Sequence, residues 1–355
     1  SAALEQIYQI KLSPWIRDMR RLFYCGEWLE SHNLHVHLLA VPDFLGFKSA
    51  PEMAKQYPAE VRRGLMLQHM GNEIVAFFGG RSVHPVGARI GGFYHAPSKA
   101  KAKELLGKLK KNLPQAKALV YWTARLPLPQ QQYHFTCVAM HHDDEYAIAD
   151  GRIISNEGLD ISKDDYEDYF KEMQVPHSTA LHCHVNGNPY LVGPLARVNL
   201  NHKQLPQEVQ DVMNDLDITW PSYNMFHSVV ARAIETYYAI LEAIRILENY
   251  VVTDHPAIIK EPQAGVGYGA TEAPRGLLWH RYEMDDNGLI TQARIVPPTS
   301  QNQARVEMDL RQSLKSYGLD HTDEELTVFC ESVVRNYDPC ISCSTHFLDS
   351  RIKRT

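Results

Sequence analysis

The chain has 355 residues, of which 44% are hydrophobic and 22% are charged, and its formal net charge is −6. A chain of this size can bury a sizeable core, as one large domain or as two ordinary ones. The acidic balance lacks the basic footprint of a nucleic-acid-binding protein, and no run approaches the roughly eighteen apolar residues of a membrane span. We therefore expect a globular protein with no nucleic-acid partner and no membrane span.

Three helices are predicted in the first third of the chain. Ser13-Pro14 has the form of an N-cap followed by proline at the first helical position, and apolar residues at helical spacing continue to about Leu39. A second helical stretch covers roughly residues 51–77, and residues 98–112 form an amphipathic basic helix. Its lysines predict a solvated face, with a docking surface for an acidic partner as the alternative.

The pattern changes between about residue 118 and residue 161 to short apolar runs broken by turns. Residues 119–122 and 133–138 are predicted strands. The clearest helix follows at residues 226–247, where apolar residues share one stripe and Glu235 and Glu242 lie on another face.

The last third of the chain predicts a β-hairpin and two helices. Residues 281–297 form the hairpin, with Asn287-Gly288 at its turn, and the helices cover residues 303–317 and 323–336. There is no internal repeat, low-complexity tract or linker in the sequence. We predict a single helix-rich α+β domain over residues 1–355, with long helices in its core and antiparallel hairpins at its periphery.

Six cysteines are scattered along the chain, and this number is too small for a disulfide framework in a protein of this size. We therefore expect a reduced, cytoplasmic setting. Four of these cysteines are expected to be buried as small apolar side chains, namely Cys25, Cys137, Cys183 and Cys330.

The strongest chemical signal is the pair Cys340-x-x-Cys343, followed by His346. Two thiols three residues apart, with an imidazole three residues further on, can share one face of a helical turn. Soft thiolates suit nickel, iron, zinc or copper(I) rather than calcium or magnesium. Because the chain has no second Cys-x-x-Cys, these residues alone leave open a redox pair, half of a zinc site completed by Cys330 and His346, or a larger thiolate centre.

Three other segments stand out. Residues 264–276 combine alternating glycines, which permit close approach of another backbone, with Arg275 between a proline and a glycine. Residues 296–302 read Val-Pro-Pro-Thr-Ser-Gln-Asn, and residues 31–35 read Ser-His-Asn-Leu-His in the first long helix. The glycine run is not a phosphate loop, because no strand-to-helix context or lysine follows it.

Three histidines near these segments are interpreted as core residues with satisfied ring nitrogens. They are His32, His35 and His84. A role in proton transfer or beside a metal cluster is the alternative.

Together the motifs resemble the large, catalytic subunit of nickel-iron hydrogenases. The resemblance covers essentially the whole chain, from residues 31–35 through Gly-Gly-Arg-Ser-Val-His-Pro at 79–85 and Glu-Ala-Pro-Arg-Gly at 272–276 to the C-terminal Asp-Pro-Cys-x-x-Cys-x-x-His at 338–346. It is most similar to the cytoplasmic branch that reduces NAD(P) or a deazaflavin. It implies an enzyme that cleaves or forms dihydrogen heterolytically at a nickel-iron centre, whose iron carries cyanide and carbon monoxide.

The resemblance also implies a role for each matching residue. Cys343 bridges nickel and iron, while Cys340 binds nickel and accepts the proton. Arg275 lies over the open metal position as an electrostatic partner, because its guanidinium stays protonated, and Asp338 holds it in place. The other implied positions are the dry lining around the diatomic ligands (Pro274, Leu278, Pro298 and Thr299, which donates to cyanide) and a magnesium or iron site (His346 and the carbonyl of Ile295).

The implied partners are an iron-sulfur small subunit, flavin- and NAD(P)-binding subunits, and a maturation endopeptidase. In this family an N-terminal Cys-x-x-Cys supplies two more thiolates, and residues 1–5 resemble the stretch shortly after that motif. We therefore expect the chain to be truncated at its start and inactive alone. Residues 347–355 would be the extension that the endopeptidase removes.

Two other functions stay open at this point. A non-catalytic electron-transfer scaffold, similar to the quinone-site core subunit of respiratory complex I, would lack the cysteines that this chain has at 340 and 343. A zinc-stabilised interaction module would use the same thiols structurally. Metal analysis separates the three functions. A hydrogenase would contain nickel and iron, a scaffold would contain no metal, and an interaction module would contain zinc alone.

Overall fold

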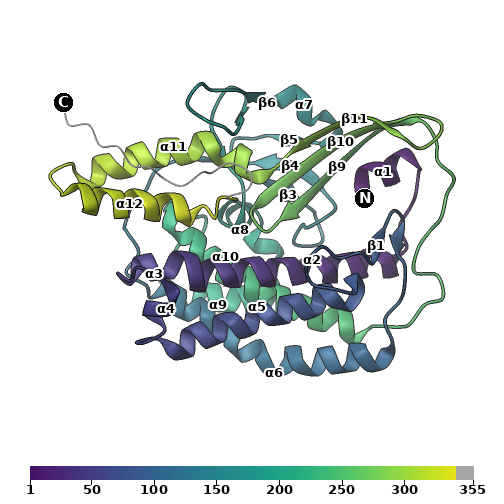
Figure 1. Cartoon of the computed structure of the whole chain (residues 1–355), viewed down its shortest axis with the longest axis horizontal. Coiled ribbons are helices and arrows are strands. Elements are labelled where there is room, and N and C mark those ends of the chain that lie inside the picture. Colours follow the sequence, from purple (N-terminus) through teal and green to yellow (C-terminus); the bar gives the residue numbers. More distant parts are fainter. Residues whose placement is uncertain (341–355) are drawn as a thin grey trace.

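The computed structural model describes residues 1–340, which form a layer of long helices beneath a layer rich in β-strands (Figure 1). The helical layer contains α2 (Pro14–Leu34), α5 (Pro58–Gly79), α6 (Lys99–Ala124) and α10 (Ser228–Glu248). Helix α2 packs against α5 and α10, and α6 packs against α10. No helix among the described residues has the length and apolarity that crossing a bilayer requires.

The first long helix begins as predicted and then changes its winding. The side chain of Ser13 accepts a hydrogen bond from the backbone N–H of Ile16, so Ser13 is the N-cap. After Leu34 the chain continues as a π-helical segment (His35–Ala40) and then as α3 (Val41–Phe44). π-Helical turns of this kind occur frequently at functional sites.

Two sequence predictions in this layer were wrong. Residues 119–122 are not a strand, because α6 continues through Pro114 and buries Leu119 and Val120. The predicted helix at 51–77 is divided into α4 (Ala50–Met53) and α5. The division lies before Pro58, because a proline disfavours helical geometry at the residue that precedes it. Glu235 and Glu242, which were placed on a different face from the apolar stripe, are both buried.

The β layer is built from small, mostly antiparallel sheets. The predicted hairpin is confirmed as β10 (Gly276–Met284) and β11 (Ile290–Val296), and β9 (Gly265–Ala273) pairs with the other edge of β10. A second sheet has the order β5-β4-β3-β8, and β6 pairs with β7. The bounds of the shorter strands are β1 (Ala88–Arg89), β2 (Gly92–Phe93), β3 (Thr136–His141), β4 (Arg152–Ser155), β5 (Asp160–Ile161), β6 (Phe170–Met173), β7 (His182–Val185) and β8 (Tyr190–Leu191).

Two C-terminal helices, α11 (Pro298–Tyr317) and α12 (Asp323–Asn336), pack against each other beside the β layer (Figure 1). Helix α12 has the predicted bounds, whereas α11 begins earlier than predicted, at Pro298. This earlier start places Pro298 and Thr299 in the first turn of a helix. The remaining helices are α1 (Ala2–Ile7), α7 (Tyr166–Tyr169), α8 (Pro194–Asn201) and α9 (Gln207–Asn214).

The core follows the two layers. One cluster of buried apolar residues lies among the long helices and includes Trp28 and Phe226. A second cluster lies among the strands, where the ring of Tyr166 stacks between those of Phe170 and Trp279. Three of the motif segments, at 274–276, 298–302 and 338–340, lie where the β layer, α8, α10 and α11 meet.

The glycines of β9 confirm the predicted close approach of another backbone. Helix α1 lies across this strand, and a Cβ at Gly267 would stand 2.1 Å from the carbonyl oxygen of Ala3. A side chain at this position would therefore push α1 away. The glycine run is a packing surface for α1 rather than a loop.

Candidate functional site

Arg275 lies in a tight turn between two paired strands. Ala273 in β9 pairs with Gly276 in β10, so Pro274 and Arg275 form a two-residue connection. Gly276 has a φ of +137°, and a Cβ there would lie 2.6 Å from Cγ2 of Val192 and 2.8 Å from the backbone nitrogen of Gly193. Glycine is therefore required for this turn to pack on the chain that enters α8, and the packing fixes the direction of Arg275.

Arg275 reaches the segment that follows α12. Its Nε donates to the carbonyl oxygen of Asp338 at 2.7 Å, and its Nη2 donates to Asp338 Oδ1 at 3.0 Å. Asp338 is buried, and its backbone has a φ of +54°. The Oδ2 atom of its carboxyl group has no hydrogen-bond partner among the described residues. Burial raises the pKa of Asp338, and the nearby guanidiniums of Arg275 and Arg232 oppose that rise.

The start of α11 meets the first cysteine of the C-terminal motif. The backbone N–H of Cys340 points to Thr299 Oγ1 at 3.4 Å. One turn along, Asn302 exchanges hydrogen bonds with the backbone of Val192, at 2.8 Å through its Oδ1 and 3.1 Å through its Nδ2. Three segments that are far apart in sequence, at 274–276, 298–302 and 338–340, therefore converge on one place.

Arg232 is a member of this cluster that the sequence analysis missed. It projects from α10 and is 2% exposed, and with Arg275 it lines a small cavity. Its Nη1 donates to Ser228 Oγ at 3.0 Å and to the carbonyl oxygen of Asn336 at 3.3 Å. Burial lowers the pKa of Arg232 to about 10, so this residue stays charged near neutral pH. Two guanidiniums therefore act on the single carboxylate of Asp338.

A buried ionic network supports the turn from below. Arg197 of α8 makes a two-point contact with Glu235 (both 2.7 Å) and a 3.0 Å contact with Glu272 of β9. The same guanidinium donates to the carbonyl oxygens of Ala273 at 2.8 Å and Pro274 at 3.1 Å. Arg197 thus attaches the Pro274-Arg275 turn to the helical layer.

Glu235 is the shared acceptor of this network. Its Oε2 also meets His32 Nε2 at 2.8 Å, and its Oε1 accepts from the hydroxyl of Tyr146 at 2.8 Å. Burial alone would raise the pKa of Glu235, but Arg197 outweighs it and lowers the pKa to about 2. Burial lowers the pKa of His32 to about 4, so its neutral ring donates to an ionised carboxylate.

The three predicted core histidines have different outcomes. His32 and His35 are fully buried, as expected, and His35 Nε2 meets the carbonyl oxygen of Arg335 at 2.7 Å. The expectation that both ring nitrogens are satisfied was wrong, because Nδ1 of each ring has no hydrogen-bond partner among the described residues. Burial lowers the pKa of His35 well below its ordinary value, with Arg232 and Arg275 adding to the effect. His84 is exposed, so its interpretation as a core residue was wrong.

The four other cysteines are mostly as expected. Cys25, Cys137 and Cys183 are buried, and burial raises the pKa of each thiol. Cys330 is only half-buried. None of these four residues lines the cavities that contain Arg275.

The residues expected to line the site are distributed around the turn. Pro274 precedes Arg275, Leu278 follows in β10 and is partly buried, and Pro298 and Thr299 are buried at the start of α11. A cavity of about 330 Å³ contains Arg275, Thr299 and Pro339 in its wall. Ile295, whose carbonyl was expected to bind a metal ion, lies near the end of β11 with 49% of its surface exposed.

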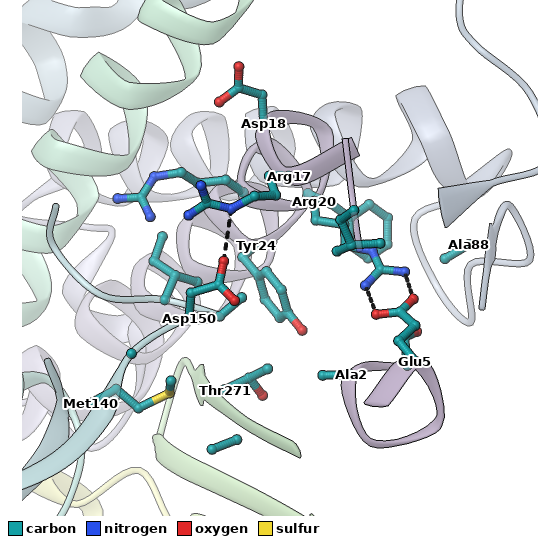
Figure 2. Close-up of a pocket in the computed structure, with 18 of the residues that line it drawn as sticks. Ala2, Glu5, Arg17, Asp18, Arg20, Tyr24, Ala88, Met140, Asp150 and Thr271 are labelled. Carbon is teal, nitrogen blue, oxygen red and sulfur yellow. Dashed lines mark hydrogen bonds and ion pairs between the residues drawn. The ribbon is translucent and has the colours of Figure 1, made fainter. Parts of the chain in front are cut away.

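A third cavity, of about 560 Å³, lies elsewhere between α1, α2 and the β layer. Figure 2 shows Arg20 forming a two-point ion pair with Glu5, and Arg17 donating to Asp150 at 2.9 Å. Burial raises the pKa of Glu27 in this wall to about 7. None of the described members of the predicted site lines this cavity, so it does not bear on their chemistry.

The remaining predicted residues lie outside the described part of the chain. They are Cys343, the expected bridging ligand, His346, the expected ligand of magnesium or iron, and residues 347–355, the expected extension.

Comparison with known proteins agrees with the geometry. Residues 162–346 match the family described as nickel-dependent hydrogenase. The chain is 33% identical over 339 residues to sulfhydrogenase 1 subunit alpha of Pyrococcus furiosus, and the alignment covers 93% of this chain and 78% of that protein. It is 28% identical over 381 residues to NAD-reducing hydrogenase HoxS subunit beta of Cupriavidus necator, covering 96% of this chain and 78% of that protein.

A solved structure of an NAD⁺-reducing NiFe hydrogenase in the H2-reduced state matches with a TM-score of 0.88 at 25% identity. The match covers 97% of this chain and 83% of that chain. It confirms the predicted helix-rich α+β fold.

Proposed function

The chain belongs to the nickel-dependent hydrogenases, as a large subunit, and we propose that it passes electrons from dihydrogen toward NAD(P) or a similar soluble carrier. The observation that carries this proposal is the convergence of Arg275, Thr299, Asp338 and Cys340. The similarity to an NAD-reducing and to a sulfhydrogenase subunit favours the branch that is coupled to a carrier.

The donor set and charge of the site suit a nickel-iron centre. Thiolates are ligands that both metals accept, and Cys340 provides one within the described residues. The guanidiniums of Arg275 and Arg232 both lie near the carboxylate of Asp338, and the charge of Glu235 also acts on Arg232. Guanidiniums in this position would complement anionic thiolates and cyanide. When bound, the centre would supply the soft, electron-rich position at which dihydrogen is polarised.

The residues of this chain would divide the remaining work. Cys340 would accept the proton released from dihydrogen, since a thiolate is basic whereas the guanidinium of Arg275 stays protonated. Arg275 would stabilise negative charge on the reacting side, in an orientation set by its two contacts with Asp338. Pro274, Leu278 and Pro298 would exclude water, and the hydroxyl of Thr299 would donate a hydrogen bond to cyanide.

The other expected ligands and partners are part of the same proposal. Cys343 would bridge the two metals, and His346 with the carbonyl of Ile295 would hold magnesium or iron. An iron-sulfur small subunit would take the electrons, flavin- and NAD(P)-binding subunits would receive them, and an endopeptidase would remove residues 347–355. We place the complex in the cytoplasm.

Metal analysis and a carrier assay together test the function. The complex purified from its native source under anaerobic conditions should contain nickel and iron in the large subunit, and it should reduce NAD⁺, NADP⁺ or a deazaflavin under dihydrogen. Zinc as the sole metal would contradict the proposal in favour of an interaction module. Absence of metal from an intact complex would favour a scaffold, and reduction of none of these carriers by a nickel-containing enzyme would exclude the proposed branch.

A further inference from the structure

We propose that His177, His182 and Glu307 form a separate binding site for a divalent first-row transition-metal ion. His182 begins β7, Glu307 lies in the middle of α11, and His177 lies in the connection between β6 and β7. The ligand atoms of the three residues all lie within 4.8 Å of one another. Nothing in the proposed hydrogenase chemistry uses these residues.

The distances converge on the carboxylate of Glu307. Its Oε1 is 3.0 Å from His177 Nε2 and 3.1 Å from His182 Nε2. The two imidazole rings stand edge to face with their centroids 5.9 Å apart. Ring nitrogens from two histidines thus lie close to one carboxylate oxygen, and a cation bound among them could contact all three ligand atoms.

The state of His182 is the second, independent observation. The residue is 5% exposed, and its Nε2 has no hydrogen-bond partner among the described residues although the carboxylate oxygen is near. The N–H direction of His182 therefore misses Glu307. A buried ring nitrogen without a partner costs free energy, and a metal ion at the centre of the three ligands would provide the missing partner.

The ligand types select the class of ion. Two imidazole nitrogens and one carboxylate oxygen suit zinc, nickel, cobalt or copper(II), whereas calcium and magnesium prefer oxygen ligands. Three protein ligands leave a further position for water. His177 and Glu307 have 66% and 38% of their side-chain surface exposed, so an ion can enter from solvent.

The position of the site indicates what a bound ion would stabilise. Strand β7 packs against α11, and both His177 and Glu307 line the cavity that contains Arg275 and Thr299. An ion would therefore tie the β6–β7 connection to α11, the helix that begins with Pro298 and Thr299. The ligands are nitrogen and oxygen atoms, which distinguishes this site from any site built on thiolates.

Zinc alone is the probe in the decisive experiment. The full chain carrying Cys340→Ser and Cys343→Ser is titrated with Zn²⁺ by calorimetry, so that the thiol pair cannot contribute. We expect one Zn²⁺ per chain, and His177→Ala, Glu307→Gln and His182→Gln should each weaken binding by at least about tenfold. X-ray absorption of the zinc-loaded chain should show nitrogen and oxygen neighbours without sulfur.

A matched control is the exposed pair His134 and Glu157, whose Nε2 and Oε1 are 2.7 Å apart but which has no third ligand among residues 1–340. His134→Ala should leave zinc affinity unchanged. His177 is exposed, so His177→Ala tests the site even if His182→Gln does not fold. The proposal is overturned if the chain binds no zinc at micromolar concentration, if His177→Ala binds as tightly as the parent, or if sulfur appears among the neighbours.

Discussion

Two clusters of buried charge meet at the Pro274-Arg275 turn, and they differ in how completely they are satisfied. Around Arg197, two carboxylates and two backbone carbonyls occupy one guanidinium, and His32 and Tyr146 satisfy Glu235 further. Around Asp338, two guanidiniums share one carboxylate whose Oδ2 has no hydrogen-bond partner among the described residues.

The difference separates support from chemistry. A buried ion cluster whose charged groups are all paired is rigid, and it suits the task of holding a turn in place. A cluster with an unpartnered carboxylate oxygen is costly unless another group binds to that oxygen. We therefore interpret the Arg197 cluster as the support of the site and the Asp338 cluster as the part that faces the metals.

The largest effect should come from breaking the supporting cluster. Arg197→Met would leave Glu235 and Glu272 buried without their cation, and the free energy of unfolding should fall by about 3–5 kcal/mol. Urea denaturation of the full chain, followed by circular dichroism, measures this change. As a control, Arg152→Met removes an exposed arginine that contacts Asp143 and Asp160, and it should have little effect. Equal destabilisation by both substitutions would refute the assignment of Arg197 as the main support.

Arg275→Lys should reduce catalysis while the protein stays folded and keeps its nickel and iron. A lysine keeps the charge but cannot make both contacts with Asp338, so dihydrogen uptake by the assembled enzyme should fall by about 10²–10³-fold. Nickel and iron contents should match the parent. Arg311→Lys, at an exposed position of α11, serves as the control and should retain full activity. Near-normal uptake by Arg275→Lys would mean that the guanidinium fork is dispensable.

Local sequence patterns were sufficient for part of the fold. The Ser13-Pro14 cap, the Asn287-Gly288 turn and the apolar stripe of α10 each depend on residues within a few positions of one another. Arg275 stands between a proline and a glycine, but the sequence pattern did not predict the tight turn that holds it. Short-range rules could not show that residues 119–122 extend α6, because an apolar run of four residues fits a strand and a buried helix equally well.

The charged members of both clusters were harder to predict, because their burial depends on partners that are distant in sequence. The sequence pattern placed Glu235 outside the apolar stripe but did not predict its burial, since a carboxylate is rarely buried without a partner. Only Arg197, on another helix, makes its burial tolerable. Arg232 was missed for the same reason, and a buried basic residue one turn before Glu235 on an apolar helix was the available signal.

Acid should weaken the supporting cluster through His32. Its pKa falls on folding from 6.5 to about 4 because of burial, so between these pH values the unfolded chain binds a proton that the folded chain does not. The free energy of unfolding should therefore rise with pH in this window, by up to about 1.4 kcal/mol per pH unit, and His32 should contribute no slope above pH 6.5. His32→Gln keeps a donor for Glu235 and should lose this part of the slope. Denaturation curves of the parent and of His32→Gln at several pH values test this prediction. The same dependence of the free energy of unfolding on pH in both proteins would mean that His32 is charged in the folded state.

Ser228→Ala should have the smallest effect, because it removes one of several contacts at the edge of the Asp338 cluster. The hydroxyl of Ser228 donates to Asn336 Oδ1 at 3.0 Å and accepts from Arg232 Nη1 at 3.0 Å, but Arg232 keeps the carbonyl oxygens of Ser228 and Asn336. We expect a loss of about 1 kcal/mol in stability and less than about tenfold in dihydrogen uptake. Ser49→Ala is the control, since Ser49 is exposed and its side chain makes no capping bond. Loss of all dihydrogen uptake by Ser228→Ala, with normal nickel and iron contents, would contradict this expectation. It would mean that the hydroxyl of Ser228 alone sets the position of Arg232. The Asp338 cluster would then depend on a single neutral contact, whereas the Arg197 cluster depends on many.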